Sequence, residues 1–270
     1  MLALIAGEGR LPVLLAEHLA AQGRAFQLCE LEGFPAENPT GAEVIRFRVE
    51  RLGSFLSTLK KRGVTEVCFA GRVQRPKLDP KKVDLATMPL VPRMLSAIKA
   101  GDDGALRQVI AIFEGAGLSV IGAHDILPDL LPPVGNLTSQ RPDDRARKDA
   151  TRGAAIVAAM GVADVGQSCV VAAGQALAIE ALPGTDRMLA ALAADRDGLP
   201  DGGIFFKAPK PSQDRRVDLP VIGPATIRAA AKARLTGVVI EAGGVMVLDR
   251  DDTVAAAEEA GLFLWVREAG

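Results

Sequence analysis

The chain has 270 residues, of which 49% are hydrophobic, and a formal net charge of −1 at neutral pH. This length is enough for two domains of ordinary size, and the near-zero charge gives no general attraction to nucleic acid or anionic lipid, so phosphate groups must be bound by locally placed Lys and Arg. No apolar run approaches the roughly 18 residues of a membrane span, and the N-terminal run is too short for a signal peptide. We therefore expect a soluble protein.

The cysteines indicate a reducing compartment. Cys29, Cys68 and Cys169 lie far apart in strand-like apolar runs, with no CxxC pair among them. An odd number without a signal peptide predicts reduced core thiols in a cytoplasmic protein. The low aromatic content and the abundance of small apolar residues favour an α/β fold with close helix-on-sheet packing.

The N-terminal stretch has the pattern of a βα unit. The continuous apolar run at residues 2–6 predicts a strand buried on both faces, and Pro12 stands at the start of the helix that follows. Between them, Gly7 and Gly9 form a turn whose backbone N–H groups can receive a phosphate. The third glycine of the dinucleotide fingerprint is absent because position 12 is Pro, so this turn is weak evidence for NAD or FAD.

Further βα units place charged residues where open α/β sheets bind ligands. Glu30 and Glu32 end the second predicted strand, about where a ribose-binding acid would lie. Arg72 and Arg75 follow the predicted strand at 66–70, for which a solvated turn is the alternative to a ligand role. The other elements expected in this half are helices over 52–62, 90–99 and 102–116 and a strand over 118–122, with His124 in a polar loop.

A proline-rich segment separates two predicted domains. Three prolines within residues 127–133 interrupt any helix, so we place the boundary between domains 1–134 and 135–270. The second domain is expected to contain helices over 150–160, 225–235 and 251–260 and a further helix with Thr185 or Asp186 as its N-cap. A loop over 161–168 and a hairpin over 169–181, turned at Gly174, should separate the first helix from the others. The remaining strands are expected over 204–208, 262–266, 236–241 and 245–248, the last two joined by a hairpin turn at Gly243 and Gly244.

The densest chemistry lies at residues 201–226. Four prolines exclude one regular helix or a central strand, so the segment should be a stiff, shaped loop. Rigid irregular backbone that carries both charge signs is typical of a site for a phosphorylated ligand. A solvated turn of mutually paired charges is the alternative, but apolar segments flank the loop on both sides, which favours a functional site.

These residue types fit phosphoryl or pyrophosphate chemistry assisted by Mg²⁺. The sequence has no Walker A motif, no HExxH and no zinc-ligand spacing, and its two histidines lack partners for a Ser-His-acid triad. Carboxylates would hold the metal, and Lys or Arg would stabilise charge in the transition state. We assign the first role to Asp214 and Asp218, and the second to Lys207, Lys210 and Arg215.

Motifs spread over nearly the whole chain resemble those of one known family. They are IAGEGRLP at residues 5–12, GRV at 71–73 with Arg75 and Pro76, DVGQ at 164–167 with Glu180 and GTD at 184–186, and the stretch 207–224. The family that they resemble is LpxI, the UDP-2,3-diacylglucosamine pyrophosphatases of lipid A biosynthesis.

The resemblance implies a Mg²⁺-dependent hydrolase that converts UDP-2,3-diacylglucosamine to UMP and 2,3-diacylglucosamine 1-phosphate. It also implies an N-terminal Rossmann-like domain, a C-terminal α/β domain of distinct fold that carries the loop 201–226, a substrate held between the domains, a homodimer, and a cytoplasmic location with peripheral contact at the inner membrane. The motifs imply substrate binding by Gly7, Gly9, Arg10, Leu11, Arg72, Gly122, Gln167, Thr185, Asp186, Met188, Gln213 and Thr226.

One position departs from the family pattern. The pattern carries Asp where this chain has Ala225, while the neighbouring residues fit. Our hypothesis is that Ala225 is an inactivating substitution at a catalytic position, where Asp would be a metal ligand or a general base. The alternative is natural variation at a helix N-terminus, which forfeits a cap of about 1 kcal/mol.

Two other function classes remain open on the residues alone. A nucleotide-binding module without catalysis would release no UMP, and a Rossmann-type oxidoreductase would bind a nicotinamide or flavin tightly. The missing third glycine disfavours the oxidoreductase. The density of acids and cations at 207–218 disfavours the pure binding module.

Overall fold

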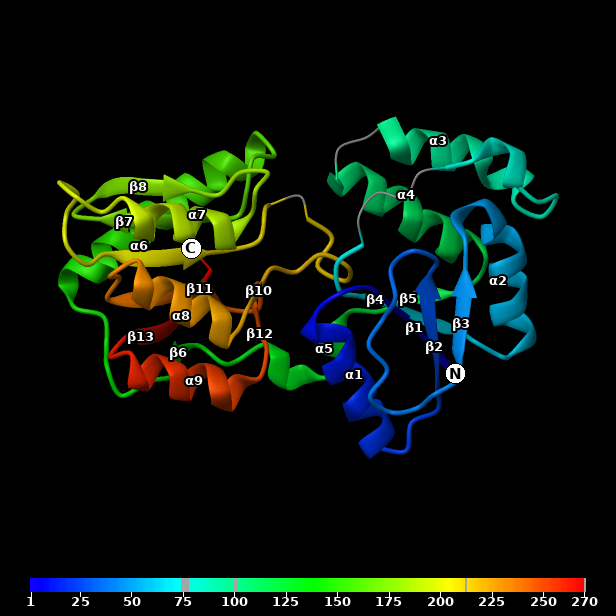
Figure 1. Cartoon of the computed structure of the whole chain (residues 1–270), viewed down its shortest axis with the longest axis horizontal. Coiled ribbons are helices and arrows are strands. Elements are labelled where there is room, and N and C mark those ends of the chain that lie inside the picture. Colours follow the sequence, from blue (N-terminus) through cyan, green and yellow to red (C-terminus); the bar gives the residue numbers. More distant parts are fainter. Residues whose placement is uncertain (74–77, 100–101, 212, 270) are drawn as a thin grey trace. The chain divides into compact units, whose positions relative to one another are not determined.

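The chain folds into two compact α/β units, which confirms the α/β class of the prediction (Figure 1). The computed structural model describes residues 1–73, 78–99, 102–211 and 213–269, without the side chains of residues 102 and 103. Unit 1 consists of Met1–Pro128 together with Asp214–Val217, and unit 2 of Asp129–Gln213 and Asp218–Gly270. Four residues from within the loop 201–226 therefore belong to the first unit.

Unit 1 is built on a parallel sheet of five strands in the order β3-β2-β1-β4-β5. The strands are β1 (Leu2–Ala6), β2 (Phe26–Leu31), β3 (Val44–Phe47), β4 (Glu66–Ala70) and β5 (Ser119–Val120). The helices are α1 (Arg10–Ala21), α2 (Leu52–Lys61), α3 (Val91–Lys99), α4 (Asp102–Gly115) and α5 (Ala123–Ile126), with 3-10 turns at Val49–Arg51, Pro80–Lys82 and Met88–Leu90.

Both faces of this sheet are covered. All five residues of β1 are buried, as expected for a central parallel strand with helices on either side. On one face, Ala3 and Val67 pack against Phe55 of α2 and Phe113 of α4. Phe55 lies edge-to-face with Phe113, with ring centroids 6.5 Å apart. The alternating strand residues therefore form the core that holds the carboxyl ends of the strands in place.

Unit 2 contains a mixed sheet of six strands in the order β6-β13-β11-β9-β7-β8. Strands β9, β11 and β13 run parallel, whereas β7 pairs antiparallel with β8 and β9, and β6 pairs antiparallel with β13. The bounds are β6 (Gly135–Asn136), β7 (Ser168–Ala172), β8 (Gln175–Ile179), β9 (Ile204–Lys207), β11 (Gly237–Glu241) and β13 (Phe263–Arg267). A separate parallel pair is formed by β10 (Val221–Ile222) and β12 (Met246–Val247).

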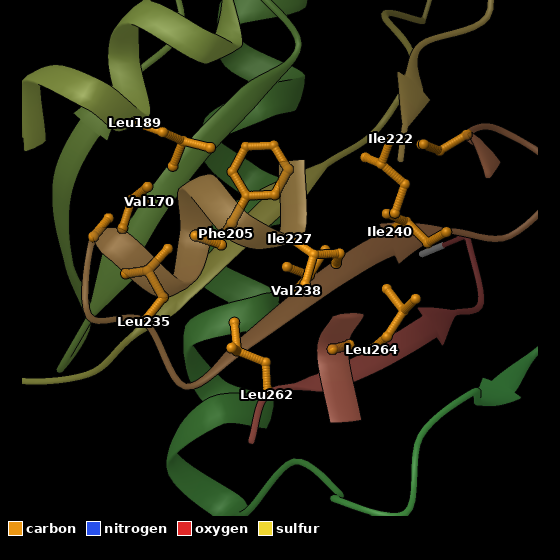
Figure 2. Close-up of a cluster of buried hydrophobic side chains, with 14 of the residues drawn as sticks. Val170, Leu189, Phe205, Ile222, Ile227, Leu235, Val238, Ile240, Leu262 and Leu264 are labelled. Atoms are coloured by element: carbon orange, nitrogen blue, oxygen red, sulfur yellow. The ribbon is translucent and has the colours of Figure 1, made fainter. Parts of the chain in front are cut away.

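Helices cover the two faces of this second sheet. One face packs against α6 (Asp144–Val162), where Gly153 lets the helix approach Phe206, because an added Cβ would lie 2.8 Å from the Phe206 Cβ. The other face packs against α7 (Thr185–Ala194), α8 (Pro224–Lys232) and α9 (Arg250–Glu259). Figure 2 shows the centre of that core, where Phe205 and Val238 meet Leu189 and Ile227.

Several expectations about elements were wrong. Gly243 and Gly244 do not turn a hairpin, because β11 pairs with β9 and β13 while β12 pairs with β10. Helix α6 begins at Asp144 rather than 150, since Asp143 caps it by accepting a hydrogen bond from the Ala146 N–H at 2.7 Å. His124 lies in α5 rather than in a loop.

Other expectations hold. The three cysteines are unpaired and buried in the cores, as predicted. None of the helices in the described parts of the chain is long and apolar enough to span a bilayer.

Candidate active site

In unit 1, several predicted ligand residues follow neighbouring parallel strands, at the edge where open α/β sheets bind ligands. Gly7 and Gly9 follow β1, Arg72 follows β4, and Gly122 follows β5. The first two turns are joined by backbone hydrogen bonds: the Glu8 N–H donates to the Arg72 carbonyl at 2.9 Å, and the Arg72 N–H donates to the Glu8 carbonyl at 2.8 Å.

The close approach of these two turns explains why both contain glycines. A Cβ on Gly7 would lie 2.5 Å from the Arg72 carbonyl oxygen, and Gly71 has a φ of +86°, with an added Cβ 2.7 Å from the Glu8 carbonyl oxygen. Gly9 is the N-cap of α1 with a φ of 107° and provides no side-chain cap. The start of α1 therefore retains backbone N–H groups that can receive an anion.

Other candidate ligand residues of unit 1 have structural partners. Arg10 lies 3.3 Å from Glu17 on the same helix, and the Leu11 side chain is buried. The Gly122 N–H donates to Asp125 at 2.7 Å, which caps the short helix α5. Any contact of Leu11 with substrate would have to use its backbone.

The predicted ribose acids are held by arginines. Glu30 accepts from Arg46 Nε at 2.5 Å and from the Ala36 N–H at 3.1 Å, and Glu32 accepts from Arg48 at 2.7 Å. These pairs account for both acids without a ligand. Arg75 lies outside the described residues.

In unit 2, Lys207 is the centre of the predicted site. It is the last residue of β9, and its side chain is buried. Its ammonium donates to the Thr185 hydroxyl at 2.9 Å, which is the one hydrogen bond that it makes among the described residues. Because an ammonium can donate three hydrogen bonds, it retains capacity for anionic oxygens.

The electrostatics of Lys207 are unusual for a lysine. Burial lowers its pKa below the ordinary value of 10.5, and the nearby charges of Glu180 and Asp186 oppose this shift. Glu180 is itself held by the hydroxyl of Ser168, the residue that faces Lys207 across the β7–β9 pair, at 2.5 Å. Sequence reasoning gave Glu180 no site role and missed Ser168, which it placed at the end of the loop 161–168 rather than at the start of β7.

The ammonium of Lys207 also lies at the start of helix α7. Thr185 is the first residue of α7, and the N-cap is Gly184, with a φ of 84° and no side-chain cap. The prediction that Thr185 or Asp186 caps this helix was therefore wrong, because the Thr185 hydroxyl is engaged by Lys207 instead. The positive end of the helix dipole thus lies beside a buried cation, an arrangement suited to binding a phosphate.

The residues after β9 form a second polar group. Lys210 Nζ donates to Asp164 at 2.6 Å, and the Lys210 backbone N–H donates to the Gln213 side chain at 3.0 Å. The Gln213 amide in turn donates to Gln167 Oε1 at 3.4 Å. Lys210, Gln213 and Gln167 are therefore brought together, and Asp164 is an additional member that sequence reasoning gave no site role.

Asp214 is engaged by one arginine. Arg216 donates two hydrogen bonds to the Asp214 carboxylate, from Nε to Oδ1 at 3.0 Å and from Nη2 to Oδ2 at 2.7 Å. Its third nitrogen, Nη1, donates to Glu114 of α4 at 2.7 Å. These hydrogen bonds lower the pKa of the Asp214 carboxyl below its ordinary value. Asp214 therefore stays ionised, and both of its oxygens accept hydrogen bonds from Arg216.

The remaining predicted residues have varied surroundings. Arg215 is exposed and Asp218 is half-buried, while Met188 packs in the core of unit 2. Thr226 accepts from the Gly223 N–H at 3.4 Å and so caps α8. Ala225 is an exposed residue in the first turn of that helix.

The acidic residues do not form a metal cage by themselves. Among the described residues, no three His, Cys, Asp or Glu side chains lie together in a group that could hold a metal ion. Asp214 accepts from Arg216 on both oxygens, which leaves it fewer lone pairs for a metal ion. A magnesium ion at this site would therefore need most of its ligands from substrate phosphates and water.

Comparison with known proteins identifies the family. The model of the LpxI N-terminal domain matches residues 1–130, and that of the LpxI C-terminal domain matches residues 133–265. The chain belongs to the LpxI family. A relative within it, the UDP-2,3-diacylglucosamine pyrophosphatase LpxI of Caulobacter vibrioides, is 39% identical over 275 residues, which span 97% of this chain and 96% of the relative.

Two solved structures are much less similar to this chain. An NAD-dependent epimerase/dehydratase from Methylobacillus flagellatus has a TM-score of 0.30 at 18% identity, covering 99% of this chain and 84% of that one. An isoflavone reductase has a TM-score of 0.28 at 12% identity, covering 99% and 78%.

Proposed function

We propose that this chain hydrolyses the diphosphate of UDP-2,3-diacylglucosamine to UMP and 2,3-diacylglucosamine 1-phosphate in lipid A biosynthesis. The observation that carries the proposal is the buried Lys207 ammonium at the uncapped start of α7. A cation and backbone N–H groups fixed in one place can bind a phosphate and stabilise the charge that grows on it during cleavage. Full-length similarity to a relative named for this substrate supports the assignment.

The roles of the site residues follow from their surroundings. Lys207 contacts the diphosphate from the interior, while Lys210 and Arg215 contribute further positive charge. Gln167 and Gln213 supply neutral donors and acceptors beside Lys210. In unit 1, the start of α1 offers backbone N–H groups that can receive an anion.

The finer fold assignment also supports a nucleotide substrate. We propose that unit 1 is a Rossmann-like nucleotide-binding domain, because its strand order and its glycine turn after the first strand are those of doubly wound dinucleotide-binding sheets. Unit 2, with its mixed sheet and its separate strand pair, is the distinct α/β fold of the family's C-terminal half.

Hydrolysis should require Mg²⁺. We propose Asp214 and Asp218 as its protein ligands, with Asp214 oriented by its hydrogen bonds from Arg216. Magnesium is usually bound by one or two carboxylates together with substrate phosphates, and when bound it would polarise the phosphoryl oxygens. Removal of the metal with a chelator should abolish UMP release, and added Mg²⁺ should restore it.

The decisive experiment measures UMP release from UDP-2,3-diacylglucosamine with Mg²⁺. Lys207→Met should lower the rate about 10²–10³-fold, the usual effect of losing one charge-stabilising contact. Lys148→Met, which removes an exposed lysine of the same unit, is the matched control and should leave the rate unchanged. Nucleotide binding without UMP release by either the parent or Ala225→Asp would instead indicate a binding module.

Position 225 needs its own comparison. We propose that a carboxylate at this position takes part in the reaction. Ala225→Asp should therefore raise the rate of UMP release at least about tenfold, because one general acid–base group typically contributes more than that to a rate. An equal rate in the two forms would contradict a catalytic role for position 225.

The homodimer and the contact with the inner membrane also remain proposals, the first to be checked by light scattering of the purified protein.

A further inference from the structure

Three polar side chains form one row across the sheet of unit 2. Ser168 of β7 pairs directly with Lys207 of β9. On the other side of β7 the pairing of Cys169 with Ile179 continues to Glu180, whose N–H donates to the Ser168 carbonyl at 2.9 Å. Residues that face each other across antiparallel strands point to the same side of the sheet. Glu180 and Lys207 therefore flank the small Ser168 on one face.

That face is the one covered by α7. Val170 and Phe205, each two positions from the row along its strand, pack with Leu189 of α7 (Figure 2). Side chains two positions apart in a strand share a face, so the row lies on the α7 side of the sheet. Lys207 accordingly reaches the start of α7 and donates to Thr185 at 2.9 Å.

The carboxylate of Glu180 is fixed in this row. Its Oε2 accepts from the Ser168 hydroxyl at 2.5 Å, and Ser168 is fully buried. The Glu180 backbone lies so close to Gly166 that a Cβ at that glycine would clash with the Glu180 carbonyl. Glu180 is itself half-buried. It thus provides a negative charge at a set position rather than on a mobile surface side chain.

Lys207 needs such a charge more than a surface lysine does. Burial lowers its pKa, and Glu180 opposes this shift more strongly than Asp186 does. Asp186 is exposed on α7, where water screens its charge. Neither acid forms an ion pair with Lys207 in the described part of the chain, so Glu180 acts through space and does not occupy the donors of the ammonium.

We propose that Glu180, held by Ser168, is a positioning residue whose fixed charge keeps the buried Lys207 ammonium protonated for an anionic ligand. A neutral lysine would neither attract a phosphate nor stabilise the charge that grows on it. The consequence for catalysis rests on the proposed function, whereas the coupling between the two side chains is a property of the folded chain alone.

A double-mutant cycle between Glu180→Gln and Lys207→Met tests the coupling without any substrate. Glutamine keeps the size of Glu180 and can still accept from the Ser168 hydroxyl, so only the charge is lost. At pH 7, Glu180→Gln should shift the denaturation midpoint of the parent to lower denaturant, and that of Lys207→Met by a smaller amount. The two shifts should become equal above the ordinary lysine pKa near 10.4, where Lys207 is neutral in the folded state.

The matched control is Glu258→Gln, on α9 of the same unit. Glu258 also accepts from a serine hydroxyl, that of Ser139, at 2.6 Å. This control should shift the midpoints of the parent and of Lys207→Met equally. Equal shifts of these two forms at pH 7 by Glu180→Gln would overturn the proposal.

The pH profile of UMP release tests the consequence for the site. In whichever of the parent and Ala225→Asp releases UMP, Glu180→Gln should lower the rate about tenfold more at pH 9 than at pH 7, because uncharged Lys207 is then populated at lower pH. Glu180→Asp, which keeps the charge, should retain most of the rate at pH 9. A loss that is equal at both pH values would contradict the role of Glu180. A rise in the Mg²⁺ concentration needed for the half-maximal rate would do the same, since it would make Glu180 a metal ligand.

The hydrolase assignment can fail separately. If neither form releases UMP while the stability cycle shows the coupling at pH 7, the charge-holding role of Glu180 stands and the proposed reaction does not. If UMP is released with the same pH profile in Glu180→Gln as in the unchanged form, the reaction stands and the role of Glu180 does not.

Discussion

At the scale of single residues, Lys207 should lower the stability of the folded protein, although the activity requires this residue. Its ammonium is buried, and burial lowers its pKa, so folding disfavours the charged form. Lys207→Met should therefore raise the free energy of unfolding by about 1 kcal/mol while activity falls, as expected when a buried charge without full compensation is removed. Chemical denaturation with Lys148→Met as the control measures this difference.

The pH dependence of that difference has a defined sign. Between the lowered pKa of folded Lys207 and the ordinary pKa near 10.4 of an unfolded lysine, the unfolded state binds more protons, so the stability of the parent rises with pH. The gap between the parent and Lys207→Met should therefore narrow as the pH rises through this window. A gap that is constant up to pH 10.5 would mean that Lys207 carries no burial penalty.

The three cysteines should be inert in the folded protein. Burial raises the pKa of each thiol, Cys29, Cys68 and Cys169, to about 12. Since the thiolate is the reactive form, a thiol reagent at neutral pH should label none of them in the native state and all three in denaturant. Rapid labelling of one equivalent without unfolding would contradict the buried positions.

At the scale of elements, the turn Asp214–Val217 is held to unit 1 by two kinds of contact. Arg216 joins Asp214 to Glu114 on α4, and Val217 packs against the core that contains Phe113. A double-mutant cycle between Glu114→Gln and Arg216→Gln should give a coupling of ~0.5–1 kcal/mol, a small value because both side chains are partly exposed. Glu17→Gln, on α1 of the same unit, is the control pair for Arg216 and should show no coupling.

Acid should loosen this turn. The pKa of Asp214 is lower in the folded state than in the unfolded one, so its contribution to stability is fully present above the ordinary pKa near 4 and is lost as the pH falls through the lower folded value. The stability difference between the parent and Asp214→Asn should therefore shrink below pH 4. An undiminished difference at the lowest pH where the protein folds would contradict the pairing.

The elements that sequence reasoning found are those with a strong local signal. Continuous apolar runs identified β1 and β4, and helix periodicity identified α2 and α4. The two-residue strand β6 carries no such signal, because it exists only through its pairing with β13. The turn at Gly243 was misread as a hairpin because the partner of β12 lies more than 20 residues earlier in the chain, at β10.

The candidate site was predictable to the same extent. Lys207 and Lys210 stand out in the sequence because they follow an apolar strand and alternate with prolines. Ser168 and Glu114 could not be found, since their partners are 12 and 102 residues away and only the folded chain brings them together. Sequence thus indicates the charged ligand-binding groups better than the residues that hold them.

At the scale of the whole molecule, the two units are interleaved along the chain. The chain leaves unit 1 after Pro128, returns to it at Asp214 and leaves it again after Val217. A chimera of this chain and its 39% identical relative, joined at 128/129, would set the turn of one parent against the α4 of the other. It should be less stable than either parent, as measured by thermal unfolding.

The matched chimera transfers residues 214–217 together with residues 1–128 and should recover the lost stability. Equal stability of the two chimeras would mean that the turn makes no specific contact with its unit.

This interleaving limits how such a protein could have arisen and how it can diverge. Two independent genes fused end to end would give two contiguous units, whereas here a four-residue piece of the second half completes the first. Once Val217 fills part of the first core, mutations in that core and in the loop between β9 and β10 are under joint selection. The two halves are therefore inherited as one evolutionary unit, and recombination between distant relatives within the gene would be selected against.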